Sequence, residues 1–292
     1  MEKVENMGLS RCLAVVVVYH PHWEELCRNI QSYPHGVDHI VVVANSPMDA
    51  PQQSFLQEKG IQLIQNPDNK GVATALNQAA ELAIHEGFEW LLTMDQDSRF
   101  GQTKSYALAQ AIHLTPPQTA AIGVESLKTP EPIPRFVPVS FLLQSGTLFH
   151  LPTWKELGGF AESLFIDAVD HEYCLRAKKA GYRIFEYPSI QLIHQLGQTL
   201  KLPKWLFTFH SHPKTGISYH SPARERFIFR NNAWLIRQYF WTFPSWAIRR
   251  IGYLSLRILY ALVLLPEKGS RLKNIFAGMR QSFRFKGERV EG

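Results

Sequence analysis

Short apolar runs alternate with longer segments of helical spacing over the first 95 residues. Each run is rich in valine, isoleucine and leucine without polar alternation, which predicts a strand buried on both faces. The predicted strands are 11–20, 39–46, 61–66 and 89–95. The predicted helices between them are 23–33, 51–60 and 71–87. This alternation predicts an α/β fold with a mostly parallel sheet and helices on both faces.

The pattern changes after about residue 115, where proline becomes frequent. The segments 114–123 and 128–138 are expected to be loops. Residues 141–150 return to a strand pattern, and 151–160 predict a short helix that ends at glycines. A further helix from about Asp170 to Lys179 is expected, followed by one or two strands that end at His194.

Charge divides the chain into two parts. The net charge is +6, but residues 1–200 carry 14 Lys and Arg against 21 Asp and Glu, and residues 201–292 carry 17 against 4. The basic part is also rich in aromatic and aliphatic residues, which favours an anionic membrane over nucleic acid as its partner. Three scattered cysteines indicate a reducing compartment, and no signal peptide is predicted.

One apolar segment of the basic part, residues 246–265, has the length of a transmembrane helix. Arg249, Arg250 and Arg257 argue against a span, because each arginine costs roughly 2.5 to 3.5 kcal/mol near a bilayer centre. On a helical wheel the three fall on one side, beside a broad apolar face. Two interpretations stay open: a helix lying in a membrane interface, or a helix that packs its apolar face on the rest of the protein with its arginines in water.

Two aspartates, Asp95 and Asp97, follow the fourth predicted strand. Ligands bind at the carboxyl ends of the strands in open α/β sheets, so the pair is expected to border a ligand crevice. In extended backbone, residues two apart point the same way. Neighbouring carboxylates repel unless a cation lies between them, and carboxylate oxygens suit Mg²⁺ or Mn²⁺. The alternative is a solvated acidic turn.

A second acidic cluster, Asp167, Asp170 and Glu172, opens the helix expected near residue 170. Two interpretations stay open for these carboxylates. They are structural caps of the helix N-terminus, or one of them is held near a substrate hydroxyl and acts as a general base. His194, which ends a predicted strand, is either a surface histidine or a third metal ligand.

Several motifs in order along the chain resemble a known family. They are VVVVYHP, NPDNKGVATALNQA, WLLTMDQDS, QSGTLF, GGFAESLFIDAVDHEYCLRAKKAGYRI, IHQLG and HSPARERFIFRNN. Together they resemble the inverting family 2 glycosyltransferases of the GT-A fold, and within them the bacterial rhamnosyltransferases. The resemblance implies a catalytic GT-A domain over residues 1–210, with a mixed sheet flanked by helices, and a helical, membrane-associating region over 211–292.

The resemblance also implies roles for the acidic residues. Asp95 and Asp97 would hold Mg²⁺ or Mn²⁺ against the diphosphate of a nucleoside diphosphate sugar, and His194 would complete the metal shell. Asp170 would deprotonate the acceptor hydroxyl, with Glu172 as the second choice for this base.

Further residues are implied in donor binding. They are Asn45, Asn66, Asn69, Gly71, Asn77, Asp95, Ser145, Gly146, Arg230 and Asn231. The chain departs from the family after the second strand, where relatives usually carry an Asp-Asn pair and this chain has Ala44 and Asn45. Either Asn45 substitutes through its amide, or base recognition differs.

The expected function is metal-dependent transfer of L-rhamnose or another deoxysugar, with dTDP-rhamnose as the favoured donor. The expected acceptor is a cell-surface polysaccharide or a lipid-linked oligosaccharide, and the expected location is cytoplasmic, peripheral to the inner leaflet of the cytoplasmic membrane. The main alternative is a non-catalytic, membrane-associated member of the fold that binds nucleotide sugars or acts as a scaffold. A haloacid dehalogenase-type phosphatase also uses D-x-D, but after the first strand of its chain.

Overall fold

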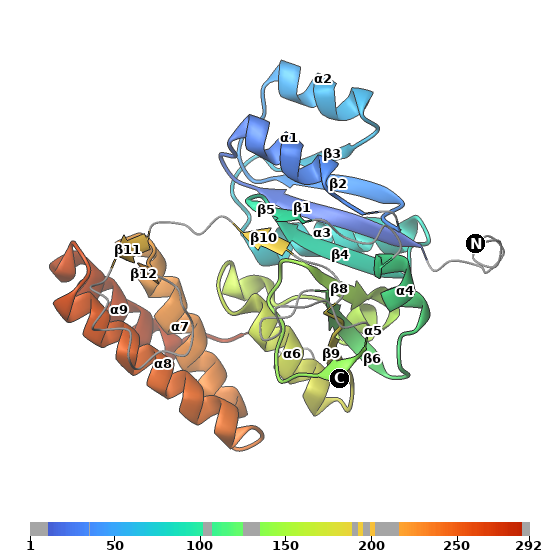
Figure 1. Ribbon diagram of the computed structural model, residues 1–292. Coiled ribbons are helices and arrows are strands. Elements are labelled where there is room, and N and C mark those ends of the chain that lie inside the picture. The colour runs from blue at the N-terminus through green and yellow to red at the C-terminus, as the bar shows by residue number, and fades with distance from the viewer. Residues whose placement is uncertain are drawn as a thin grey trace. The chain divides into compact units, whose positions relative to one another are not determined.

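The computed structural model describes residues 11–34, 36–101, 107–124, 135–188, 192–194, 199–201 and 216–287. For residues 194, 199–201 and 216–218 it describes the backbone alone. Contacts divide the chain into two units. Figure 1 shows the chain, with its colour running from the N-terminus to the C-terminus. We call residues 1–194 with 288–292 the sheet unit, and residues 195–287 the helical unit. The expected domain boundary at residue 210 lies outside the described residues and stays a prediction.

The described strands of the sheet unit form one large sheet and a two-stranded ribbon. The large sheet has the order β3-β2-β1-β4-β8-β6-β9-β7. Its strands are β1 (Cys12–Val18), β2 (His39–Ala44), β3 (Gln62–Gln65), β4 (Trp90–Asp95), β6 (Thr119–Gly123), β7 (Val137–Pro138), β8 (Thr147–His150) and β9 (Arg183–Glu186). The first four are parallel, whereas β8 runs antiparallel to both β4 and β6. The expected α/β fold with a mixed sheet is confirmed.

Helices cover this sheet, as Figure 1 shows. They are α1 (Trp23–Gln31), α2 (Ala50–Glu58), α3 (Val72–His85), α4 (Ala107–His113), α5 (Leu151–Glu156) and α6 (Val169–Lys179). The buried side of α3 is mostly alanine, so this helix packs closely on β1, β2 and β4. The central strand β1 is apolar and almost wholly buried, as expected for a strand between two parallel neighbours.

The parallel register brings the ends of four strands to one edge of the sheet. Val17 of β1 lies opposite Asp95 of β4, and Ala44 of β2 lies opposite Gln65 of β3. The residues that follow these strands therefore collect at one edge, where the sequence predicts a ligand crevice.

One expected loop proves to be a strand. The proline-rich segment 114–123 contains β6, whose five residues are all buried. Its two prolines precede the strand, and the apolar stretch after them pairs with β8 and β9. Proline therefore marks the start of this strand instead of excluding it.

The described residues of the helical unit form three helices and a pair of antiparallel strands. They are α7 (Pro222–Tyr239), α8 (Pro244–Val263), α9 (Lys268–Ser282), β11 (Thr199–Lys201) and β12 (Gly216–Ser218). A small apolar core joins the three helices. Beside it, the fully buried Glu225 of α7 binds Arg257 of α8 at 2.7 and 2.9 Å and Arg271 of α9 at 3.2 Å. One carboxylate thus links all three helices.

This ion cluster changes the interpretation of the apolar segment 246–265. Arg257 binds Glu225, and Arg250 binds the side-chain oxygen of Asn232, so these two arginines face the interior of the helical unit. Neither expected arrangement placed them there, and only Arg249 of the three is exposed. Among the described residues, no helix is long and apolar enough to cross a membrane.

Replacing Glu225 with glutamine tests the ion cluster. The change leaves Arg257 and the fully buried Arg271 without a counter-charge, so we expect the helical unit to lose about 3 kcal/mol of unfolding free energy. Calorimetric unfolding of the whole chain measures this loss. Glu58→Gln, at an exposed position of α2, is the control, and equal unfolding of the two variants would contradict the role of the cluster.

Candidate functional site

Asp95 ends β4 and is held by the segment that precedes β8. The backbone N–H of Asp95 donates to Ser145 Oγ at 3.1 Å, and Gln144 Nε2 donates to Asp95 Oδ1 at 3.3 Å. The backbone N–H of Gly146 donates to the Thr93 carbonyl at 2.8 Å. Ser145 and Gly146, both predicted from the QSGTLF motif, therefore lie beside the first aspartate and support it. Gln144 has the same function and was not predicted.

Gly146 allows a further close approach. Its φ is +73°, and a Cβ at this position would overlap the side chain of Leu192. Leu192 belongs to β10 (Leu192–His194), which forms the two-stranded ribbon with β5 (Ser98–Phe100). The glycine thus lets β10 lie against the end of the large sheet.

The residue between the two aspartates fixes their turn. Gln96 Oε1 accepts from the Tyr19 N–H at 2.7 Å, and Gln96 Nε2 donates to the Tyr19 carbonyl at 3.3 Å. Asn29 Nδ2 donates to the Gln96 carbonyl at 2.8 Å. Residues 96–97 form a turn between β4 and β5, so the expected extended backbone from Asp95 to Asp97 is wrong. Asp95 is half-buried in this turn and Asp97 is exposed.

His194 reaches the same turn through strand pairing. In the ribbon, His194 lies opposite Ser98, which directly follows Asp97. Directly opposite residues of an antiparallel pair are about 5 Å apart at Cα. The His194 side chain is outside the described residues, and the described side chains alone contain no metal-binding group of three acidic, histidine or cysteine residues. Two carboxylates and an imidazole at these chain positions are a donor set that suits Mg²⁺ or Mn²⁺.

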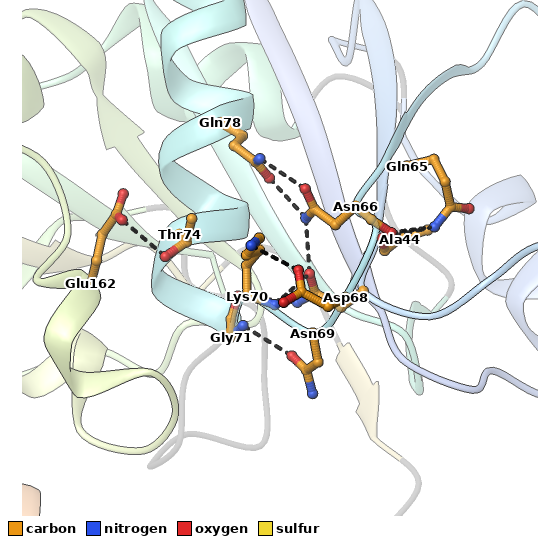
Figure 2. Close-up of polar contacts among 11 residues, drawn as sticks. Ala44, Gln65, Asn66, Asp68, Asn69, Lys70, Gly71, Thr74, Gln78 and Glu162 are labelled. Atoms are coloured by element: carbon orange, nitrogen blue, oxygen red, sulfur yellow. Dashed lines mark hydrogen bonds and ion pairs between the residues drawn. The ribbon is translucent and has the colours of Figure 1, made fainter.

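An amide network holds the loop before α3. Asn66 Nδ2 donates to Asn45 Oδ1 at 2.9 Å and to Gln78 Oε1 at 3.0 Å, and Gln78 Nε2 donates back to Asn66 Oδ1 at 2.9 Å. Asn45 Nδ2 donates to the Gly71 carbonyl at 3.1 Å. Figure 2 shows the Asn66–Gln78 pair beside the loop that contains Lys70 and Gly71. Asn45 and Asn66 therefore position the loop through their side chains.

Ala44 cannot provide the contact that the usual aspartate makes in relatives. Its side chain is fully buried in the core of the sheet unit. The Ala44 carbonyl accepts from Gln65 Nε2 at 3.3 Å, a bond that ties β2 to the end of β3.

Gly71 joins this loop to the second acidic segment. Its φ is +84°, and a Cβ here would lie 2.5 Å from Phe165 Cδ2 and 2.6 Å from the Phe165 carbonyl oxygen. The Val72 N–H donates to the same carbonyl at 2.6 Å, and Asn69 Oδ1 accepts from the Gly71 N–H at 2.9 Å. Only glycine permits this approach, which brings Asp167 and its neighbours to the N-terminus of α3.

Asn77 makes a second link between the same segments. Its Nδ2 donates to the Phe160 carbonyl at 2.9 Å and to Glu162 Oε1 at 2.8 Å, and its Oδ1 accepts from the Phe160 N–H at 2.8 Å. Thr74 donates to the other oxygen of Glu162 at 3.0 Å (Figure 2). Because each of these bonds is to protein, Asn77 acts here as a positioning residue, and its predicted contact with nucleotide stays a prediction.

The backbone before α6 is unusual. Phe165, Asp167 and Ala168 all have a positive φ, between 64° and 65°, and we call this segment the left-handed turn. Such residues cost about 1 to 2 kcal/mol each and persist where the surrounding structure fixes them. The turn places Asp170 in the first turn of α6, where the helix dipole stabilises a negative charge.

The two predicted bases have different surroundings. Asp170 is half-buried, and one of its oxygens accepts from the His171 N–H at 2.8 Å. Glu172 is only 4% exposed, and Arg176 binds its two oxygens at 2.9 and 2.7 Å. Arg176 also donates to the Gly159 carbonyl at 2.6 Å. Glu172 is therefore part of a buried ion pair, whereas Asp170 borders the left-handed turn.

Tyr33 also lies near the first aspartate. Burial raises the pKa of its hydroxyl, and the negative charge of Asp95 raises it further. Sequence reasoning missed Tyr33 because it comes from the loop after α1, far along the chain from any motif.

Arg230 and Asn231 lie in α7 of the helical unit. Arg230 Nε donates to Asn231 Oδ1 at 2.8 Å, and its guanidinium lies 4.4 Å from the Phe285 ring centre. Burial lowers the pKa of Arg230, and the neighbouring charge of Arg226 lowers it further. Their predicted contact with the diphosphate stays a prediction.

A protein-family model matches part of the chain. Residues 14–131, which contain most of β1, the whole of β2 to β4 and the Asp95–Asp97 turn, match the family model described as glycosyl transferase family 2. The match assigns this segment, which is less than half of the chain, to glycosyl transferase family 2.

A curated relative and two solved structures resemble the chain beyond this segment. The dTDP-rhamnosyl transferase RfbF of Shigella flexneri is 25% identical over 265 residues, covering 78% of this chain and 81% of that protein. S. aureus TarS 1–349 in complex with UDP-GlcNAc has a TM-score of 0.55 at 14% identity, with 90% of this chain and 79% of that chain covered. GalNAc-T7 with UDP, GalNAc and Mn²⁺ has a TM-score of 0.53 at 13% identity, with 65% of this chain covered. The match spans only 44% of the GalNAc-T7 chain.

These comparisons confirm three predictions. The family 2 match confirms the predicted family, the two structures confirm the GT-A fold, and the family with its rhamnosyl transferase relative confirms the enzyme class, a glycosyltransferase.

Replacing Gly71 with alanine tests the junction between the loop before α3 and the segment before α6. The new Cβ would meet Phe165 in addition to the left-handed backbone, so we expect a loss of about 2 to 4 kcal/mol of unfolding free energy. Gly60→Ala is a matched control, since Gly60 has φ +67° and nothing within 4 Å of its Cβ position. Chemical denaturation measures both variants, and equal losses would show that the Phe165 contact contributes nothing.

Proposed function

We propose that the protein is an inverting, divalent-cation-dependent glycosyltransferase. It transfers a deoxysugar, with L-rhamnose and a dTDP donor favoured, to a cell-surface polysaccharide or a lipid-linked oligosaccharide. The observation that carries this proposal is that two acidic segments both lie at the edge of the sheet where β3 and β4 end. The Asp95–Asp97 turn ends β4, and the Gly71–Phe165 contact brings the Asp167–Asp170 segment beside the loop that follows β3.

The donor site would use the residues after β2, β3 and β4. Asn45 and Asn69 position the loop at 69–71, which leads into the N-terminus of α3, where the helix dipole favours the negative charge of a phosphate. The relative RfbF is named for dTDP-rhamnosyl transfer, which supports the donor. Because Ala44 is buried, recognition of the base must come from other groups than the usual aspartate.

Asp95, Asp97 and His194 would hold the cation. When bound, Mg²⁺ or Mn²⁺ neutralises the charge that develops on the departing nucleoside diphosphate. Mn²⁺ in the GalNAc-T7 complex, which shares the fold, supports this choice. The protein's own contribution is to keep Asp95 in place through Ser145 and Gln144.

Asp170 would be the general base. It would take the proton of the acceptor hydroxyl, whose oxygen then attacks the anomeric carbon from the face opposite the diphosphate and inverts its configuration. Glu172 is the weaker choice, because Arg176 occupies both of its oxygens. The acceptor would be presented at the inner leaflet of the cytoplasmic membrane.

Titration calorimetry with dTDP, UDP and GDP, with and without Mn²⁺, tests the donor site. We expect metal-dependent binding of one nucleotide, weakened at least tenfold in Asp97→Ala because one of the metal-binding carboxylates is lost. Glu58→Ala removes an exposed carboxylate at the end of α2, before β3, and serves as the control. Metal-independent binding, or no binding by any of the three, would contradict the metal site.

Substitution of the two acidic residues of α6 separates their roles. We expect Asp170→Asn to lower kcat by about 10² to 10⁴ with donor affinity unchanged, because only proton transfer is lost. Glu172→Gln should instead lower the unfolding free energy, by about 3 kcal/mol, because Arg176 loses its buried partner. Steady-state kinetics with thermal melts distinguishes the two, and full activity of Asp170→Asn would exclude it as the base.

A further inference from the structure

The helix α8 exposes an apolar face that nothing in the described helical unit covers. Its exposed large apolar residues are Ile248, Ile251, Leu256, Leu259, Leu262 and Val263, which are 37 to 61% exposed. Their spacing of mostly three or four residues places them on one side of the helix. We call these six residues the α8 apolar face. Trp241, in the turn before α8, is 90% exposed.

Polar contacts fix this orientation. Arg250 and Arg257 lie on the opposite side of α8, where they bind Asn232 and Glu225 of α7. Turning the apolar face inward would break the contacts of Glu225, which would then be buried with Arg271 alone. A surface helix ordinarily buries its apolar side in its own domain. In α8 the side with two arginines is inside, so the apolar face is left for a partner.

The charge of the helical unit indicates the chemistry of that partner. Its described residues include only two acids, the buried Glu225 and the exposed Glu267. The exposed cations among them are Arg226, Arg237, Arg249, Lys268, Lys273, Arg280, Arg284 and Lys286. Two exposed aromatic side chains of this unit, Phe276 and Phe283, accompany them on α9 and directly after it. A unit that exposes apolar and aromatic side chains together with many cations and few acids suits a bilayer with anionic headgroups.

A second copy of the chain is a poorer partner for this face. Two helical units that met through α8 would bring their cations close together, and like charges at an interface cost free energy. A bilayer instead offers hydrocarbon to the apolar side chains and anions to the cations.

We propose that the α8 apolar face docks on an anionic lipid bilayer, with α8 lying in the interface and Trp241 at headgroup level. This goes beyond the proposed transfer reaction, since it names the surface and the face of the helix that holds the enzyme there. It develops the first of the two sequence-based interpretations, a helix lying in a membrane interface, with the difference that Arg250 and Arg257 bind inside the helical unit.

Vesicle sedimentation of the purified full chain tests the proposal without any sugar donor. The vesicles contain phosphatidylcholine alone or mixed with phosphatidylglycerol. We expect the wild type to sediment with the mixed vesicles and much less with the neutral ones. Leu259→Glu should weaken this binding about tenfold or more, and Leu259→Ser about threefold, because leucine's transfer into hydrocarbon is lost in both. Ser270→Glu makes the same charge change at an exposed position of α9 and should weaken binding less than Leu259→Glu, by about fivefold at most, because no apolar contact is lost.

Each other result overturns a stated part of the proposal. If the wild type binds neither kind of vesicle, or if the Leu259→Glu variant binds as well as the wild type, docking through this face is overturned. Equal binding to neutral vesicles would overturn the anionic preference. A wild-type dimer by light scattering that Leu259→Glu converts to a monomer would assign the face to a second copy. Circular dichroism melts confirm that the variants are folded, and activity with a soluble acceptor separates this test from that of the reaction.

Discussion

The close approach of Gly71 to Phe165 is the contact on which the arrangement of the site depends. On one side of it, the loop that ends at Gly71 follows β3 and leads into α3. On the other side, the left-handed turn of Phe165 and Asp167 leads into α6. Without room for the Phe165 carbonyl at Gly71, the two segments would separate, and the second acidic cluster would lose its place near the edge of the sheet.

Several polar residues that the sequence predicts to bind a ligand instead make hydrogen bonds to the segments that form this junction. Asn45 and Asn66 brace the loop from the side of β2 and β3, and Asn77 braces it from within α3. Buried amides must be hydrogen-bonded, and in this site the partners are the loops themselves. Such residues contribute to ligand binding indirectly, by positioning the loops that border the site. A motif therefore marks a site correctly while leaving open which of its members touch the substrate.

The parts of the structure that are local in sequence could be predicted. The first four strands, the long alanine-rich helix and the place of Asp95 at the end of a strand follow from apolar patterns within a few residues, although the edge strand β3 is only half-buried. The turn at residues 96–97 could not be predicted, because Gln96 is held by Tyr19, which is 77 residues away. The strand β6 was missed for a similar reason, since its pairing with β8 and β9 outweighs the prolines before it.

The two arginines of α8 that face inward are another feature that depends on a distant residue and could not be predicted from local sequence. Their position also explains why the apolar face of α8 is outside. Periodicity shows that a helix has two faces, but it cannot show which of them is buried when the polar face has a specific partner. That partner is Glu225, 32 residues before Arg257, and its carboxylate is bound by arginines from two helices. Burying such a cluster is costly, because the desolvation of each charge must be offset by the ion pairs. Burial of the α8 apolar face would have stabilised the unit more simply. The orientation of α8 is thus hard to explain by folding stability alone, and it is consistent with a face kept available for a partner outside the helical unit.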